Sequence, residues 1–231
     1  MKKLILLTSL ITLLTLALFA SAEPAVIDSG DTAWVLTSTA LVLLMTPGLA
    51  FFYGGMVRRK NILEVLMKCF ITMGVLSLQW VIIGYSLAFS PTGKFIGGFE
   101  YAFLNNVTGA PSPYAATIPH LAFMMFQGMF AIITPALIIG AFVERMKFSS
   151  FLLFTVVWAT FVYDPVCHWV WSKSGWLAGI GALDFAGGTV VHINAGIAAL
   201  VSAIFIGKRK HTEHGPTPHS LPLTVLGAAW G

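Results

Sequence analysis

The strongest constraint on this chain is a series of long apolar runs that carry almost no charge. Each run is about 20 residues long, which matches an α-helix that crosses the hydrocarbon core of a bilayer. A sixth run begins near Leu221, after five complete ones at 34–57, 69–89 (entered through 62–68), 121–143, 148–171 and 185–207. The sequence therefore predicts an all-α integral membrane helical bundle with five complete spans and the start of a sixth.

Composition excludes a water-soluble globular fold. Charged residues make up 10% of the chain and hydrophobic residues 57%, whereas soluble domains carry about 25% charged residues. The net charge of +4 does not indicate a nucleic-acid partner, because the basic residues form short clusters at the ends of spans. Cys69 and Cys167 both lie in apolar runs, so we expect them to pack there rather than to form a disulfide framework.

The first residues have the three parts of a secretory signal peptide. Two lysines form the positive region, an apolar run follows, and Ala20-Ser21-Ala22 fits the A-x-A cleavage rule. We predict a cleavable signal peptide over 1–22 and a mature membrane domain over 23–231. A retained first helix is the alternative, but the polar stretch that follows favours cleavage.

The basic residues predict the orientation of the bundle. Eleven Lys and Arg remain after the signal segment, and nine of them lie in or beside the loops that follow the first, third and fifth spans. Only Lys94 and Lys173 fall on the opposite side. The positive-inside rule therefore places those three loops in the cytoplasm and the mature N-terminus outside. We expect a multi-pass protein of the inner (plasma) membrane.

Two ionisable side chains mark the fifth run, where such groups are costly and are functional candidates by default. At 100° per residue, His192 shares a helix face with Gly188, Ala195 and Ala199. Small residues allow close helix approach or leave a narrow lumen. His192 could therefore be a structural residue at a helix contact or a pore-lining residue, and the sequence favours neither role. Asp184 stands just before the run, where a carboxylate can cap the first turn and add negative potential at the mouth of the span.

Aromatic residues form a second candidate feature. Phe126 and Phe130 are spaced i, i+4 and so share one face of the third span, while Trp171 stands at the end of the fourth. Such residues commonly face lipid, pack in a core or form an interfacial belt. They can also hold a small cation against their ring faces, and periodicity alone does not choose between these roles.

Signals for enzymatic chemistry are lacking in the sequence. It contains no Walker loop, G-x-S-x-G elbow, HExxH or paired-cysteine motif. Asp164 precedes Pro165 within the fourth run, and we expect it to satisfy backbone groups at a kink. We therefore predict no catalytic residue, cofactor or metal site, and a protein that is not an enzyme.

Several motifs together resemble the ammonium transporter family (Amt/Mep/Rh). The signature segment is "DFAGGTVVHINAGIAALVSAIFIGKR" at 184–209, which joins an acid, a Gly-Gly pair, a histidine and a basic stop. The supporting motifs are "TPGLAFFYGGMVRRKN" (46–61), "FQGMFAIITPALIIGAFVERMKF" (126–148), "HWVW" (168–171) and "PHSLPL" (218–223). The resemblance runs from about residue 32 to residue 223.

The resemblance implies a role for each candidate residue. Trp171 matches the tryptophan of a vestibule that recruits ammonium, and Phe126 and Phe130 match phenylalanines at the gate. Phe130 corresponds to one of two stacked rings that close the pore. Asp184 matches an acid that shapes the recruitment site, and His192 matches the first of two hydrogen-bonded histidines that line a narrow pore.

The resemblance also implies a larger assembly. The family fold has eleven spans in two inverted repeats and assembles as a homotrimer with one pore per subunit. A trimeric PII-type signalling protein typically blocks the cytoplasmic face in bacteria, and methylammonium serves as an analogue of ammonium and ammonia.

The sequence departs from the family in length. This chain ends where the family continues, so we expect an N-terminal fragment whose second pore histidine, second gate phenylalanine and vestibule serine lie outside it. An ammonium sensor with the same fold is the alternative function.

Overall fold

The computed structural model describes residues 26–209 and 218–231. The predicted signal peptide lies outside the described residues. Within these described ranges, five helical segments are long and apolar enough to cross a membrane: Ser29–Met56, Arg59–Phe89, His120–Phe142, Phe148–Gly179 and Gly188–Ile206. These segments confirm the five predicted spans, with the first starting five residues earlier than the apolar run and the fifth starting three residues later.

Most elements follow one another along the chain with short connections; the exceptions are a long loop between the second and third spans and the connection from α9 to α10. The α-helices are α2 (Ser29–Met56), α3 (Ile62–Gln79), α4 (Tyr85–Phe89), α5 (His120–Phe142), α6 (Phe148–Trp158), α7 (Asp164–Trp171), α8 (Trp176–Gly179), α9 (Asn194–Ile206) and α10 (Leu221–Trp230). Short 3₁₀ turns occupy η1 (Arg59–Asn61) and η3 (Ala102–Leu104). The long loop carries an antiparallel pair, β1 (Pro111–Ser112) and β2 (Ala115–Pro119).

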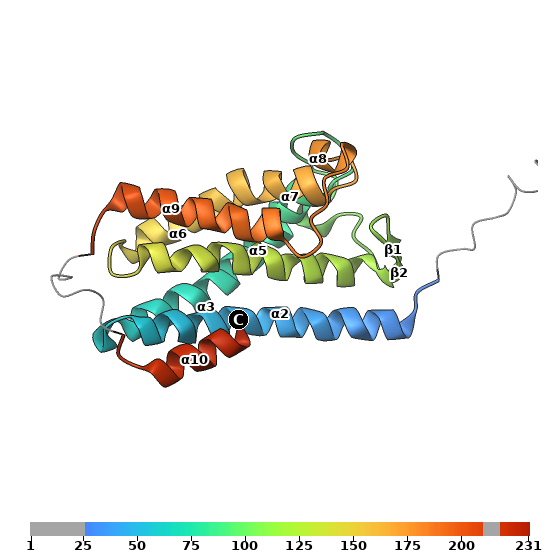
Figure 1. The fold of residues 1–231 in the computed structure, drawn as a ribbon. Helices are drawn as coiled ribbons and strands as arrows, with labels where there is room; N and C mark the ends of the chain where they lie inside the picture. Colours follow the sequence, from blue (N-terminus) through green and yellow to red (C-terminus); the bar gives the residue numbers. More distant parts are fainter. Residues whose placement is uncertain (1–25, 210–217) are drawn as a thin grey trace, which may run out of the picture.

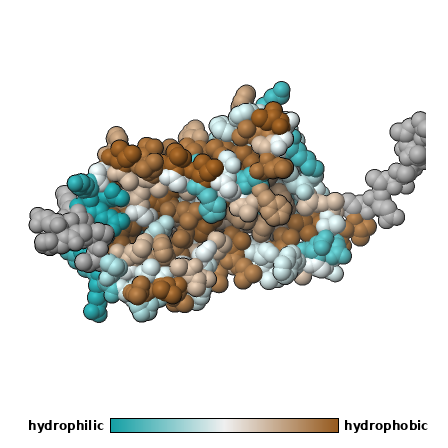
Figure 2. All heavy atoms as spheres, viewed as in Figure 1, coloured by the Kyte–Doolittle hydropathy of each residue, from teal (hydrophilic) through white to brown (hydrophobic). Residues whose placement is uncertain are grey.

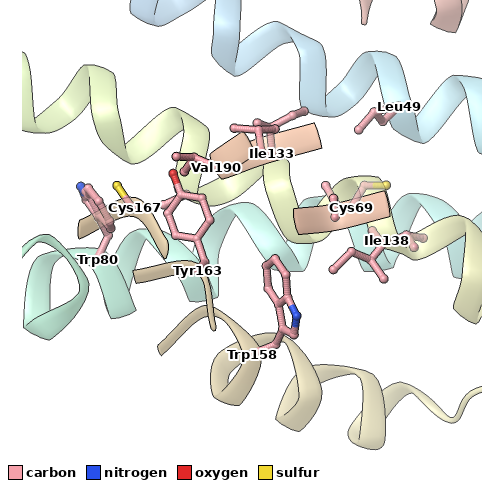
Figure 3. Packing of buried hydrophobic residues seen from close by; sticks show 14 of the residues in the cluster. Leu49, Cys69, Trp80, Ile133, Ile138, Trp158, Tyr163, Cys167 and Val190 are labelled. Carbon is pink, nitrogen blue, oxygen red and sulfur yellow. The ribbon is translucent and has the colours of Figure 1, made fainter. Parts of the chain in front are cut away.

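The core of the bundle surrounds α5. This helix contacts α2, α3 and α9, and Figure 1 shows it between α2 below and α9 above. Ile133 and Ile138 of α5 belong to the same buried cluster as Tyr163, Cys167 and Val190 (Figure 3). Most of α5 is thus enclosed by protein, whereas α2 and α9 are largely exposed.

The surface of the bundle suits a bilayer. Figure 2 shows hydrophobic residues along the sides and hydrophilic residues at the two ends. Side chains such as Leu153 and Phe205 are 68% and 91% exposed, which would be costly in water and is favourable against lipid. Cys69 and Cys167 are buried and unbridged, as their apolar surroundings predicted.

Three of the spans contain a π-helical segment: η2 (Trp80–Gly84), η4 (Ala159–Tyr163) and η5 (Gly188–Ile193). The fourth span was expected to break at Asp164-Pro165, but the irregularity begins earlier, in η4. A π turn inserts an extra residue into the hydrogen-bond ladder, which helps the helix to accommodate the N–H that Pro165 lacks. Pro165 then stands in the first turn of α7.

Asp164 was expected to bond backbone groups at a kink, and this expectation was wrong. Its carboxylate does not bond the backbone; Oδ2 accepts a hydrogen bond from Nε2 of Gln79 at 2.7 Å. Asp164 is fully buried, because α3 and α7 bring these two side chains together from different spans. A buried carboxylate needs such a partner, and this bond ties the second span to the fourth.

The last helix, α10, lies along α2 (Figure 1). Gly227 is buried in this contact, where a Cβ would overlap the backbone of Phe52. Gly55 of α2 likewise lies against the backbone of α10. Small residues at the crossing allow the two backbones to approach closely.

Candidate functional site

The largest concentration of aromatic rings surrounds a cavity of about 310 Å³, which we call the aromatic cavity. It is formed where α4, α5 and α7 meet the long loop between the second and third spans and the segment before η5. Its lining consists of aromatic side chains with one amide and one carboxylate: Phe89, Tyr114, Phe123, Phe126, Gln127, Phe130, Trp171, Asp184, Phe185 and Ala186. Four of the five predicted site residues therefore lie at one cavity.

The two phenylalanines of α5 contact each other as their spacing predicted. The ring centroids of Phe126 and Phe130 are 5.1 Å apart with an edge-to-face angle of 87°. Phe130 also meets Trp171 edge to face, at 5.8 Å and 72°. Edge-to-face contact directs the positive edge of one ring at the negative face of another. Both phenylalanines line the cavity rather than a lipid-facing surface.

Asp184 holds the segment that begins the fifth span. Its Oδ2 atom accepts hydrogen bonds from the backbone N–H groups of Thr189 and Val190, at 2.8 and 2.9 Å. The predicted capping role is therefore present, with the carboxylate satisfying the first free donors of η5. The other oxygen, Oδ1, is buried and has no hydrogen-bond partner among the described residues. The same side chain thus caps a helix and lines the cavity.

The capping segment also positions the tryptophan. Nε1 of Trp171 donates a hydrogen bond to the backbone carbonyl of Asp184 at 3.0 Å. Gly187 has a positive φ of 78° and lies next to the Trp171 ring, so a side chain there would be strained. The orientation of Trp171 therefore depends on the loop that Asp184 anchors.

A second, smaller cavity has a volume of about 120 Å³, and we call it the apolar cavity. Its lining is apolar apart from one imidazole: Val42, Met45, Leu49, Phe130, Ile133, Leu137, Ala186, Val191, His192 and Gly231. Phe130 and Ala186 line both cavities. Phe130 is therefore shared by an aromatic space and an apolar one.

The helical-wheel prediction for His192 assumed a regular α-helix. The residue falls in the π-helical segment η5, where each residue turns the helix by less than 100°. Ala195 is buried, while His192 and Gly188 are exposed. The shared face with Gly188, Ala195 and Ala199 stays a prediction, and His192 lines the apolar cavity.

Six residues that line the aromatic cavity were not predicted, and three of them are informative. Phe123 and Gln127 share the α5 face with Phe126 and Phe130, so the i, i+3, i+4, i+7 period could have found them. Gln127 Oε1 is buried without a hydrogen-bond partner in the described part of the chain. Tyr114 comes from the long loop, where no local pattern points to the cavity.

Tyr114 closes one wall of the aromatic cavity. Its ring stacks on Phe123 at 5.3 Å with an angle of 6°, and its hydroxyl donates to the carbonyl of Phe89 at 2.6 Å. Burial raises the pKa of the Tyr114 phenol, despite a hydrogen bond with Ser172 that acts in the opposite direction. The group therefore remains a neutral donor at physiological pH.

Comparisons with known proteins agree with this geometry. A family model described as "Ammonium Transporter Family" matches residues 33–230. An ammonium transporter from Bacillus subtilis is 54% identical over 200 residues, covering 87% of this chain and 49% of the relative. The ammonium transporter Amt1 of Archaeoglobus fulgidus is 50% identical, covering 87% and 50%. This chain spans about half the length of these relatives.

Solved structures give the same result for the fold. The crystal structure of Candida albicans Mep2 superimposes with a TM-score of 0.81 at 37% identity, covering 88% of this chain and 46% of that one. A structure titled "Sensor Amt Protein" gives a TM-score of 0.77 at 26% identity, covering 87% and 51%.

The fold and the two cavities define a multi-pass α-helical membrane protein in which one phenylalanine lines both an aromatic cavity and a small apolar one. The family model covers most of the chain, and the relatives share about half of their aligned residues with it. The chain belongs to the ammonium transporter family, as its sequence motifs indicated.

Proposed function

We propose that this chain supplies the recruiting and gating half of an ammonium transporter, rather than an enzyme active site. The observation that carries the proposal is that Phe130 lines both the aromatic cavity and the apolar cavity. We propose that its ring forms the boundary between them. One side of the ring offers groups that attract a cation, and the other side offers a lining that favours a neutral molecule. The site is thus arranged to change the charge state of its substrate.

The aromatic cavity provides the recruitment step. A monovalent cation over an aromatic face gains roughly 0.5–2 kcal/mol, depending on how far it is desolvated. Trp171, Phe126 and Phe130 supply such rings, and the free oxygens of Gln127 and Asp184 can accept hydrogen bonds from the ammonium N–H groups. Ammonium, with four donors and one positive charge, suits this combination.

The apolar cavity provides the conduction step. A charged ammonium ion would lose its hydration among Leu49, Ile133 and Leu137, which is costly in a low-dielectric space. Neutral ammonia pays far less, so we propose that the proton leaves before or at Phe130. His192 is the one titratable side chain of the lining and can both accept and donate a proton. We assign to it the handling of that proton.

The remaining features of the whole protein follow from family membership. We propose a homotrimer with one pore in each subunit, whose second histidine, second gate phenylalanine and vestibule serine come from the part of the fold that this chain does not span. The basic loops would face the cytoplasm, where a PII-type protein could bind, and the mature N-terminus would lie outside the inner membrane.

Uptake of labelled methylammonium by cells that lack their own transporter tests the proposal. A full-length protein that contains this chain should support uptake, and His192→Leu should abolish it or make it insensitive to the proton gradient. Asn194→Leu, two residues along the same span, is the matched control and should retain uptake. Unchanged, proton-coupled uptake in His192→Leu would contradict the proton-handling role.

An ammonium sensor is the second candidate, and the likeness to the structure titled "Sensor Amt Protein" supports it. A sensor would bind ammonium in the same aromatic cavity without sustained flux. Saturable methylammonium binding without accumulation in cells or vesicles would favour the sensor over the transporter.

A further inference from the structure

The aromatic cavity has a positive charge of the chain itself beside it. Lys173 is one of the two lysines that the sequence places on the side opposite the basic clusters. Its Nζ atom lies 6.0 Å from the ring centroid of Tyr114. Tyr114 lines the cavity, whereas Lys173 does not. The chain therefore holds an alkylammonium group next to a ring that forms a wall of the proposed recruitment site.

Two contacts fix the position of this lysine. Its Nζ atom donates a hydrogen bond to the backbone carbonyl of Pro113, the residue before Tyr114. The hydroxyl of Tyr114 in turn lies 3.2 Å from Oγ of Ser172, the residue before Lys173, and Ser172 is fully buried. Each of the two residues is thus tied to the neighbour of the other, so the charge stays close to the ring.

The charge of Lys173 has no ion-pair partner among the residues that the structure describes. Lys173 is exposed. Glu100, an acid of the long loop between the second and third spans, accepts hydrogen bonds from the hydroxyls of Ser90 and Thr92 instead. A cation in the aromatic cavity would therefore meet the positive charge of Lys173 without an ion pair to neutralise it.

The size of the effect follows from the distance between the two charges. A cation held by an aromatic ring lies within about 6 Å of the ring centroid, so a cation on the cavity side of Tyr114 would stand about 10 Å from Nζ of Lys173. Repulsion between two unit charges at that distance weakens binding about twofold in a water-like dielectric and about 15-fold at an effective dielectric near 20. The repulsion acts on each charge of a ligand and is therefore larger for a dication.

We propose that Lys173 is a specificity-determining residue of the aromatic cavity, which weakens the binding of every cation and discriminates against those with two charges. The inference rests on the proposed function, because it takes the aromatic cavity as the cation site. A singly charged ligand keeps the attraction of the rings and of Asp184 and meets the repulsion once. A doubly charged amine meets it twice, so the cavity is tuned to a monovalent ligand that binds weakly and can leave again.

Equilibrium binding of labelled methylammonium to a purified, full-length protein that contains this chain tests the proposal, with 1,3-diaminopropane as the doubly charged competitor. Lys173→Gln removes the charge and keeps an amide that can donate a hydrogen bond. At low ionic strength, this variant should bind methylammonium between about twofold and about 15-fold more tightly. The inhibition constant of 1,3-diaminopropane should fall by a larger factor. A purely structural lysine predicts the opposite sign, because a loosened Tyr114 would weaken the binding of both amines.

Two variants and one condition serve as controls. Lys173→Arg keeps the charge and should bind both amines like the unaltered protein. Lys94→Gln removes the other lysine on this side, which is exposed and lies outside the cavity lining, and it should change the affinities less than Lys173→Gln does. The Debye length is about 3 Å at 1 M salt, so the tighter binding of Lys173→Gln should disappear at that concentration.

Three results would overturn the proposal. Unchanged or weaker methylammonium binding in Lys173→Gln would show that the charge does not act on the cavity. An equal gain in Lys94→Gln would indicate diffuse repulsion rather than a specific residue, and a gain that persists in 1 M salt would exclude an electrostatic cause. Binding without uptake by cells would contradict transport and leave the comparison of variants intact, whereas no binding in any variant would refute the aromatic cavity as a cation site and this inference with it.

Discussion

The two roles of Asp184 can be separated by substitution. Both capping hydrogen bonds use Oδ2, which accepts from the N–H groups of Thr189 and Val190. Asparagine has a carbonyl oxygen in the same place and caps helices about as well as aspartate. Asp184→Asn should therefore cost less than about 0.5 kcal/mol in the free energy of unfolding. It should nevertheless remove the negative charge from the aromatic cavity.

Asp184→Ala removes the cap as well as the charge. Loss of a cap costs roughly 0.5–2 kcal/mol, and a buried N–H that loses its partner costs roughly 1–3 kcal/mol. Because Val190 is fully buried, we expect a total loss of about 2–3 kcal/mol. Trp171 donates to the backbone carbonyl of residue 184, which alanine keeps. The loop that carries this carbonyl would lose its carboxylate anchor, however, so the tryptophan should lose its fixed orientation in this variant.

The charge itself has a separate, measurable effect on ammonium binding. A carboxylate about 6 Å from a bound monovalent cation contributes about 0.7 kcal/mol in a water-like dielectric and about 3 kcal/mol at an effective dielectric near 20. Asp184→Asn should thus weaken ammonium binding between about threefold and about 150-fold, whereas Asp184→Ala should weaken it further through Trp171.

Thermal unfolding of the purified protein and methylammonium uptake by cells are the two assays. The reasoning predicts that Asp184→Asn unfolds near the temperature of the unaltered protein, whereas Asp184→Ala unfolds clearly lower. Equal destabilisation by the two substitutions would refute the capping argument. Normal uptake in Asp184→Ala would refute the link from the cap through Trp171 to recruitment.

The other predictions concern packing, charge and the barrier between the cavities. Gly227→Ala should lower stability by about 1–3 kcal/mol because its Cβ would overlap the α2 backbone; Gly74→Ala, which meets no atom within 4 Å, is the control and should be neutral or stabilising in the same unfolding assay. Burial would raise the pKa of Glu144, but hydrogen bonds from its neighbours and the nearby basic charges outweigh it and hold the pKa below its usual value. The ionised carboxylate therefore stabilises the fold at pH values above the ordinary glutamate pKa, and that stability is lost as the pH falls through the lowered pKa of Glu144. In denaturant unfolding, Glu144→Gln should lack this acid-dependent loss of stability. The same pH profile in the variant and the unaltered protein would argue against the ion pair with Arg58. Phe130→Ala should join the two cavities and allow ion leak in vesicle conductance measurements, and preserved selectivity would show that another group forms the barrier.

Much of the fold could be predicted from local sequence. Five runs of membrane length with almost no charge predict five spans because the hydrocarbon core fixes the length of a helix that crosses it. The i, i+4 spacing of Phe126 and Phe130 likewise predicts their contact, since the period of the α-helix fixes which side chains are neighbours. Asp184 could be read as a cap because capping depends only on the residues that follow it.

Features that depend on distant segments could only be found in the tertiary structure. The bond between Asp164 and Gln79 joins two spans, and Tyr114 reaches the aromatic cavity from a long loop. The helical wheel at His192 assumed 100° per residue, and nothing in the local sequence indicated that η5 is π-helical. Local periodicity reports which side chains share a face, whereas the packing of helices decides what that face meets. In this protein, the sequence determined the spans and the residue types of the candidate site, and the packing around α5 decided that Phe130 lines two cavities.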